Sequence, residues 1–205
     1  ITFLTDVCYM IKDILTESRD NKEFQIVYQS SWTLGNSTDI IKKNYYHDKE
    51  FTSGFFNEIL NVILQTFDIN FSGIQGDNIK TNLTRAIGST ILLILERDFN
   101  DDAIKNICQS VEKLNWCLKH CISFKLHWNI CFAFSYLLPN ETFKKICSQH
   151  KCSNGSLLID EIFNCLYNLM KTTKNHKVQC YAAEALCSTN FTIEEPSKLW
   201  CQIVN

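Results

Sequence analysis

The stretch from Cys147 to Cys152 carries the densest set of side chains that could bind a metal ion. Cys147, His150 and Cys152 place three potential ligands within six residues. A structural zinc site needs four Cys or His ligands, usually in two closely spaced pairs, and no second pair follows at a usable spacing. We therefore expect a solvated loop between helices here, and we keep a metalloprotein or enzyme that uses residues 147–152 as the alternative.

No other group of residues has the spacing of a catalytic site. Nucleophilic catalysis needs a nucleophile, a base within hydrogen-bond reach and a group that orients the base, and none of the five histidines lies in such a motif. Gly73 and Gly76 lack the Lys-Ser/Thr that follows in a phosphate-binding loop. Asp101 and Asp102 stand before a helix, where acidic side chains are favoured electrostatically. The sequence therefore predicts no enzyme, no cofactor and no small-molecule substrate.

The charge balance gives no reason to expect nucleic acid or a membrane as a partner. The 20 Lys and Arg residues against 22 Asp and Glu residues give a net charge of −2, whereas nucleic-acid-binding proteins usually carry a basic excess. The longest apolar stretch, 86–95, is far shorter than the ~18 to 20 residues of a membrane-spanning helix. We therefore expect a protein partner.

The 11 cysteines are scattered, and most stand where a helical pattern calls for an apolar residue. Such positions are Cys8, Cys108, Cys131, Cys165 and Cys187. An unpaired cysteine behaves as a small hydrophobic residue, and an odd number suits a closed disulfide framework poorly. We expect reduced cysteines in the core of a protein with a cytoplasmic or nuclear location.

A pattern repeated four times along the sequence predicts the helices that would position a surface site. Four segments match one another, 25–35, 78–88, 125–135 and 177–187, and their last residues are spaced by 53, 47 and 52. Apolar or small residues recur in them at i, i+4, i+7 and i+8, which is one face of an α-helix. We expect that face to be buried. It starts at Ile26, Ile79, Leu126 and Val178 and continues at Ser30, Leu83, Ile130 and Ala182.

A second amphipathic segment precedes each of these, at 3–15, 55–67, 104–118 and 157–170. Each unit then consists of a helix A, a connector and a helix B. Because one such pair cannot bury its apolar faces alone, pairs stack on their neighbours. The pattern predicts an all-α fold, a right-handed α-solenoid of the armadillo or HEAT kind with about four antiparallel helix pairs. An ordinary helical bundle is the alternative.

The expected solenoid is a single domain that spans 1–205. Its repeats cover approximately 1–45, 51–96, 102–139 and 157–190, and 197–205 would begin a truncated fifth repeat. Pro196 stands where that repeat starts, at a helix position that tolerates a missing N–H. The chain begins at Ile1 rather than at a methionine, so we expect a fragment or a processed product.

The B segments also resemble a known family. The matching residues are Ser31 to Asp39, Ile79 to Gly88, Lys125 to Asn129 and Asn175 to Val178, followed by Leu199 and Trp200. In this order they are similar to the HEAT repeat-containing protein 6 family. The resemblance runs through most of the chain and is weak in the A segments and in 70–77. It implies the C-terminal part of a longer HEAT-repeat solenoid.

A second stripe on the B segments contains residues that could bind a protein partner. It runs through Tyr28, Trp32, Asn36, Thr81, Arg85, Ser89, Trp128, Phe132 and Tyr136, and then through Cys180, Glu184 and Ser188. Aromatic residues and Arg contribute most of the binding free energy at protein interfaces. The candidate anchors are therefore Tyr28, Trp32, Asn36, Arg85, Trp128, Phe132 and Tyr136.

These anchors favour a non-catalytic protein-interaction scaffold. Trp32 and Asn36 also match the Trp-x3-Asn element with which armadillo import receptors hold an extended peptide. The other segments depart from that element, so an import-receptor-like peptide adaptor is kept as an alternative. The competing interpretation of the aromatic residues is that they pack between repeats. We expect packing for Trp128 and partial exposure for Trp32 and Arg85.

The helical phase gives a first testable prediction. Leu83→Asp or Ile130→Asp should place an unpaired carboxylate between packed helices and cost several kcal/mol of stability. The same change at Thr81 or Gln179, which we expect on the solvated side, should cost well under ~1 kcal/mol. Thermal unfolding measures both classes, and equal losses of melting temperature would show that the phase is wrong.

Overall fold

The computed structural model describes residues 2–21, 23–48, 51–69 and 73–189 of the chain. In this part the regular structure is α-helical, apart from one isolated antiparallel bridge between Lys151 and Leu157. The predicted all-α class is therefore confirmed for these residues. The helices are α1 (Thr2–Asp20), α2 (Phe24–Asn44), α3 (Ser53–Phe67), α4 (Gly73–Leu95), α5 (Asp101–His120), α6 (Phe124–Leu137), α7 (Glu141–Gln149), α8 (Leu158–Thr172) and α9 (His176–Cys187).

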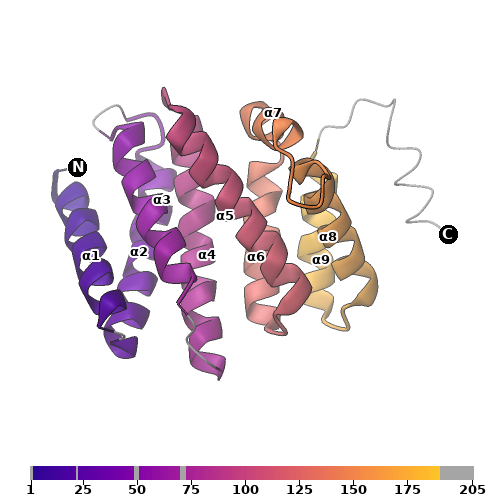
Figure 1. The fold of residues 1–205 in the computed structure, drawn as a ribbon, viewed down its shortest axis with the longest axis horizontal. Helices are drawn as coiled ribbons and strands as arrows, with labels where there is room; N and C mark the ends of the chain where they lie inside the picture. Colours follow the sequence, from indigo (N-terminus) through magenta and orange to yellow (C-terminus); the bar gives the residue numbers. More distant parts are fainter. Residues whose placement is uncertain (1, 22, 49–50, 70–72, 190–205) are drawn as a thin grey trace.

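The helices form two layers, with α1, α3, α5 and α8 in the first and α2, α4, α6 and α9 in the second (Figure 1). Within each layer every helix contacts the next one. Across the layers α1 packs on α2, α3 on α4, α5 on α6 and α8 on α9. Of the predicted ranges, 1–45, 51–96 and 157–190 each span one of these pairs, whereas 102–139 starts one residue after the first residue of α5, Asp101.

Polar side chains determine where several helices begin. A residue directly before the helix accepts a hydrogen bond from a backbone amide three residues further on, which is worth about 1 kcal/mol to a helix. The starts of these helices are therefore encoded locally. The capping residues are Thr52 for α3, Asn100 for α5, Ser123 for α6, Asn140 for α7 and Asn175 for α9.

The predicted core stripe is buried in three of the four second-layer helices. Ile79, Leu126 and Val178 are at most 1 % exposed. The expectation for Ile26 is wrong, because Ile26 is 44 % exposed and its neighbour Val27 takes the place in the core. Within its own layer α2 contacts α4 on one side and no described helix on the other.

Two glycines allow the second-layer helices to approach one another closely. A Cβ atom at Gly35 of α2 would lie 3.1 Å from the carbonyl oxygen of Asn82 on α4. A Cβ atom at Gly88 of α4 would lie 2.9 Å from the Cβ of Ala133 and 2.2 Å from the hydroxyl oxygen of Tyr136, both on α6. Ordinary contacts of a Cβ atom begin at 3.4 Å. Only glycine therefore fits at position 88 without a shift of the neighbouring atoms.

Helix α4, one of the two inner helices of the second layer, is more enclosed than we expected. It contacts α2 and α6 in its own layer and α3 and α5 in the other. Thr81 and Ser89, which we expected on the exposed stripe, are 2 % and 0 % exposed, so that expectation is wrong. Thr81→Asp would therefore bury a carboxylate and cannot serve as the solvated control in the test of helical phase. Gln179→Asp remains as that control, because Gln179 is half-buried.

Residues 141–149 form α7, a helix that the sequence pattern did not predict. Phe143, Ile146 and Cys147 on one side of it are buried, and α7 contacts α5 and α8. The expectation that Cys147 belongs to a solvated loop is therefore wrong. The available signal was the i, i+3, i+4 spacing of these three residues after Asn140.

The described cysteines carry free thiols, and six of the ten are buried. Cys8, Cys108, Cys131 and Cys165 lie in the core as expected, whereas Cys187 is exposed, contrary to the expectation. Burial raises the pKa of the Cys8 thiol to about 11 and that of Cys131 to about 12. These thiols therefore behave as small apolar side chains at neutral pH.

Two further expectations concern chain segments rather than side chains. Among the described residues, no helix combines the length and the apolar character needed to cross a membrane. The expected fifth repeat at 197–205, with Pro196 before it, lies outside the described residues.

Gly88→Ala should destabilise the fold, because the added methyl group would force α4 and α6 apart. Overpacking of a core typically costs about 1 to 3 kcal/mol, which outweighs the roughly 1 kcal/mol that alanine gains over glycine within a helix. Urea unfolding measures the net loss.

Gly54→Ala in α3 is the matched control for Gly88→Ala. An added Cβ at Gly54 would have the Thr52 hydroxyl oxygen as its nearest neighbour, at 3.8 Å. This variant should be at least as stable as the wild type. If Gly88→Ala were equally stable, α4 and α6 could not be packed as closely as described.

Candidate functional site

A cavity of about 390 Å³ lies between α2, α4 and α6 on the side of the second layer that faces away from the first. We call this side the B face and the cavity the B-face cavity. Three helices from distant parts of the sequence thus bring the candidate anchors together. Six of the seven line the cavity, namely Tyr28, Trp32, Arg85, Trp128, Phe132 and Tyr136.

Two aromatic rings of the B-face cavity are open to solvent. Trp32 on α2 is 49 % exposed and Phe132 on α6 is 42 % exposed. Trp128 is only half-buried, but its ring stacks on Tyr181 of α9 with the centroids 5.5 Å apart. Trp32 and Phe132 are therefore the rings that a partner could contact, whereas Trp128 also helps to hold α6 against α9.

Tyr181 was not among the candidate anchors. Besides Trp128, its ring meets Phe132 edge to face, with the centroids 5.8 Å apart. Tyr181 thus extends the aromatic surface from α6 to α9. Its position one turn after Lys177 on the last B segment was the only signal in the sequence, and it does not distinguish a surface tyrosine from a buried one.

Two lysines lie over aromatic rings at the cavity. The ammonium nitrogen of Lys177 on α9 is 3.7 Å from the ring centroid of Trp128. The ammonium nitrogen of Lys42 on α2 is 4.0 Å from the ring centroid of Tyr136. Such a contact is worth about 0.5 to 1 kcal/mol at an exposed position and more where it is desolvated. The rings of the B face therefore already hold cations of the chain itself.

Arg85 joins α4 to α2 through a polar network. Its Nη2 donates to the Asn36 side-chain oxygen at 3.0 Å and to Asp39 Oδ2 at 2.8 Å. The Ser89 hydroxyl donates to Asp39 Oδ1 at 2.5 Å, and the Lys42 ammonium nitrogen lies 3.5 Å from the same oxygen. Asn36 and Arg85 are thus engaged within the chain, and the Arg85 side chain is still 31 % exposed.

Burial changes the titration of two groups beside this network. It lowers the pKa of the Lys42 ammonium group, against the opposing attraction of Asp39. It raises the pKa of the Tyr136 phenol well above the usual value, so the ring is neutral at physiological pH. The phenol of Tyr136 therefore adds no negative charge to the cavity.

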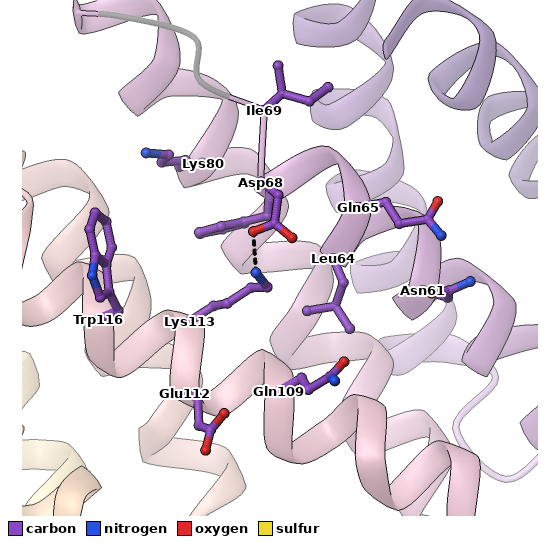
Figure 2. Close-up of a pocket in the computed structure, with 11 residues that line it drawn as sticks. Asn61, Leu64, Gln65, Asp68, Ile69, Lys80, Gln109, Glu112, Lys113 and Trp116 are labelled. Carbon is purple, nitrogen blue, oxygen red and sulfur yellow. Dashed lines mark hydrogen bonds and ion pairs between the residues drawn. The ribbon is translucent and has the colours of Figure 1, made fainter. Parts of the chain in front are cut away.

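A larger cavity, of about 690 Å³, lies between α3, α5 and the start of α4 (Figure 2). An ion pair between Lys113 and Asp68 crosses it, while Trp116 and Lys80 stand on one side and Asn61 on the other. Trp116 is 53 % exposed. The sequence pattern did not indicate this site, because it arises from the gap between two first-layer helices.

The lining of the larger cavity is largely paired within the chain. Besides the Lys113–Asp68 pair, Glu112 Oε1 lies 3.0 Å from Nε2 of His150, and the Lys80 ammonium nitrogen lies 5.8 Å from the Trp116 ring centroid. Both signs of charge are present, so the lining does not select a ligand by charge. The B-face cavity is the stronger candidate for a binding site.

The candidate metal ligands at 147–152 do not converge. Cys147 is buried on α7, whereas His150 pairs with Glu112 and Cys152 is half-buried in the following turn. In the part of the chain that the structure describes, no group of three or more His, Cys, Asp or Glu side chains is arranged to hold a metal ion. The turn that follows, at 151–157, belongs instead to a hydrogen-bonded cluster around the Glu161 carboxylate, which we call the clasp.

Glu161 of α8 forms the centre of that clasp. Its Oε2 lies 2.5 Å from the ammonium nitrogen of Lys119 on α5, and its Oε1 accepts hydrogen bonds of 2.8 Å from the Asn154 amide and the Ser156 hydroxyl. The Lys119 contact, followed by these two hydrogen bonds, lowers the pKa of the Glu161 carboxyl to about 2. The clasp therefore ties α5, α8 and the 151–157 turn together.

The depressed pKa predicts how stability changes with pH. A carboxyl whose pKa is lower in the folded state than in the unfolded state stabilises the fold above the unfolded pKa of about 4.3, and this stabilisation is lost as the pH falls towards 2. Glu161→Gln should therefore be less stable than the wild type near neutral pH, and the difference should shrink between about pH 5 and pH 2. Urea unfolding at a series of pH values measures this difference.

Glu141→Gln, which alters an exposed pair with Lys144, is the control and should change stability little at any pH. A constant difference for Glu161→Gln would contradict the clasp.

Comparison with known proteins adds no family to this description. No protein-family model matches the chain, and no solved structure matches it.

Proposed function

We propose that this chain is a non-catalytic scaffold that binds a segment of a protein partner at the B-face cavity. The observation that carries the proposal is that the exposed rings of Trp32 and Phe132 line one cavity together with Arg85. Aromatic and Arg side chains in the middle of an interface supply most of its binding free energy. A concave site between helices is also a usual place for a ligand.

The proposal includes an α-solenoid of the HEAT or armadillo kind, part of a longer protein similar to the HEAT repeat-containing protein 6 family. It is supported by four packed helix pairs that follow one another in chain order, with each helix contacting the next helix of its own layer. In such a stack one helix of each pair contributes to a continuous binding surface. In this scheme α7 is an insertion between the third and fourth pairs.

An import-receptor-like adaptor for basic peptides is less well supported. The Asn36 side-chain oxygen, which belongs to the Trp-x3-Asn element, already accepts a hydrogen bond from Arg85. Arg85 and Lys125 both line the cavity, and Lys177 lies beside it over Trp128. These cations would repel a basic segment.

Selection of random peptides displayed on phage tests the proposed function. The 205-residue chain should enrich peptides that the Trp32→Ala, Phe132→Ala double variant does not retain. Each substitution should weaken the selected peptides by more than about tenfold, since loss of a central anchor typically costs about 2 kcal/mol. Fluorescence anisotropy measures the affinities, and circular dichroism checks that the double variant and the two single variants keep their helicity.

Trp116→Ala is the matched control. Trp116 is also a half-exposed tryptophan, but it lies at the larger cavity on the first layer. Its loss should leave peptide affinity unchanged. If Trp116→Ala weakened the peptides as much as Trp32→Ala, or if the double variant retained them, the B-face cavity would not be the binding site. Trp128→Ala should behave differently and lower the melting temperature, because Trp128 packs on Tyr181.

A further inference from the structure

The charges at the B-face cavity are unevenly distributed for a chain with a net charge of −2. Arg85 and Lys125 line the cavity, and Lys42 and Lys177 lie over its rings. Among the described residues of the lining, the single carboxylate is that of Asp39. We propose that the B-face cavity binds an acidic protein segment, one that carries Asp or Glu residues beside an apolar side chain. This inference rests on the proposed function and names the chemistry of the partner.

Asp39 does not cancel the positive charge of the cavity. Its two oxygens are held by Arg85, Ser89 and Lys42, so its charge is already compensated inside the network. Lys125 and Lys177 are different, because neither forms an ion pair with a carboxylate within the described part of the chain. Both are exposed, so both can contact a carboxylate of the partner.

Lys125 and Lys177 stand at the starts of two neighbouring helices. Lys125 is the second residue of α6 and Lys177 the second residue of α9, and these helices contact each other. The first turn of a helix carries a partial positive charge from its free amide groups. The positive charges of the two lysines and the partial positive charges of the two helix starts therefore lie at the same end of the B face.

The acid nearest to Lys177 on the stripe of α9 is Glu184, which is exposed two turns further along the helix. Glu184 does not line the cavity. It would repel an acidic segment only if that segment continued along α9 towards its C-terminal end. The site therefore favours a partner segment whose carboxylates lie near Lys125 and Lys177 and whose apolar side chain packs against Trp32 and Phe132.

Three short fluorescein-labelled peptides test the charge preference. The first contains Asp, Glu, Gly and Phe; in the second Asn and Gln replace the acids; in the third Lys replaces them. Fluorescence anisotropy with the 205-residue chain should give an affinity at least about tenfold higher for the acidic peptide than for the amide peptide. The Lys peptide should bind least. The preference should weaken as salt is raised, because exposed charges are screened.

Charge-reversal variants test which residues are responsible. Lys125→Glu with Lys177→Glu should lower the affinity for the acidic peptide by about tenfold or more. The matched control is Lys145→Glu with Lys105→Glu, two exposed lysines on α7 and α5, which changes the net charge equally. The control should stay within about twofold of the wild type. Circular dichroism verifies that all variants are folded.

Each outcome decides the inference separately from the proposed function. If the amide or Lys peptide binds as tightly as the acidic one and still depends on Trp32, the acidic preference is wrong and the scaffold function stands. If no peptide binds, the acidic preference is again wrong, and the phage selection alone decides the scaffold function. Binding of an oligothymidylate that depends on Lys125 and Lys177 and exceeds that of the acidic peptide would also overturn the inference in favour of nucleic acid.

Discussion

The close approach of α4 to α2 and α6 is the packing constraint on which the B face depends. Gly35 and Gly88 remove the two side chains that would otherwise separate these helices. Tyr136 can then lie against α4, and Asp39 on α2 can reach both Arg85 and Ser89 on α4. With larger residues at the two positions, the polar network could not form with its present distances, and the walls of the cavity would stand further apart.

The Asp39 network contributes to alignment more than to stability. The Arg85 and Asp39 side chains are 31 % and 34 % exposed, and partly exposed ion pairs contribute about 1 kcal/mol or less. The buried apolar side chains around Leu83 and Ile130 are worth about 1.5 to 3 kcal/mol each. The apolar core therefore holds the layers together, while the network specifies which turn of α4 faces which turn of α2.

The lysine–ring contacts are weak enough to be exchanged for contacts with a partner. A contact such as that of Lys177 with Trp128 is worth about 0.5 to 1 kcal/mol at an exposed position, less than a charge-assisted hydrogen bond to a carboxylate, which is worth about 1.5 to 3 kcal/mol. A lysine can therefore leave the ring for a carboxylate without a large cost. In the proposed function the rings keep the ammonium groups near the cavity in the free protein and become contact area in the complex.

The sequence determined the helices and most of their buried faces. Period, capping residues and apolar stripes are local properties, so the A and B segments and the burial of Ile79, Leu83, Leu126, Ile130 and Val178 could be predicted from it. It also carried a signal for α7 in the spacing of Phe143, Ile146 and Cys147, which we missed beside the Cys and His residues of the same stretch. Cys147, His150 and Cys152, which we kept only as an alternative metal site, do not converge in the described structure, since short spacing in sequence does not make ligands meet.

Only the tertiary structure decided how enclosed each helix is and which surface residues meet. Thr81 and Ser89 occupy the same stripe as Trp32, yet they are buried because α4 has neighbours on both sides, while Ile26 is exposed because α2 has none on one side. Two further contacts also join residues about fifty positions apart in sequence. Tyr181 stacks on Trp128, and the Arg85 Nη2 donates hydrogen bonds to Asn36 and Asp39. The physical reason is that periodicity fixes the direction of a side chain relative to its own helix, whereas exposure and pairing depend on which other helices lie in that direction.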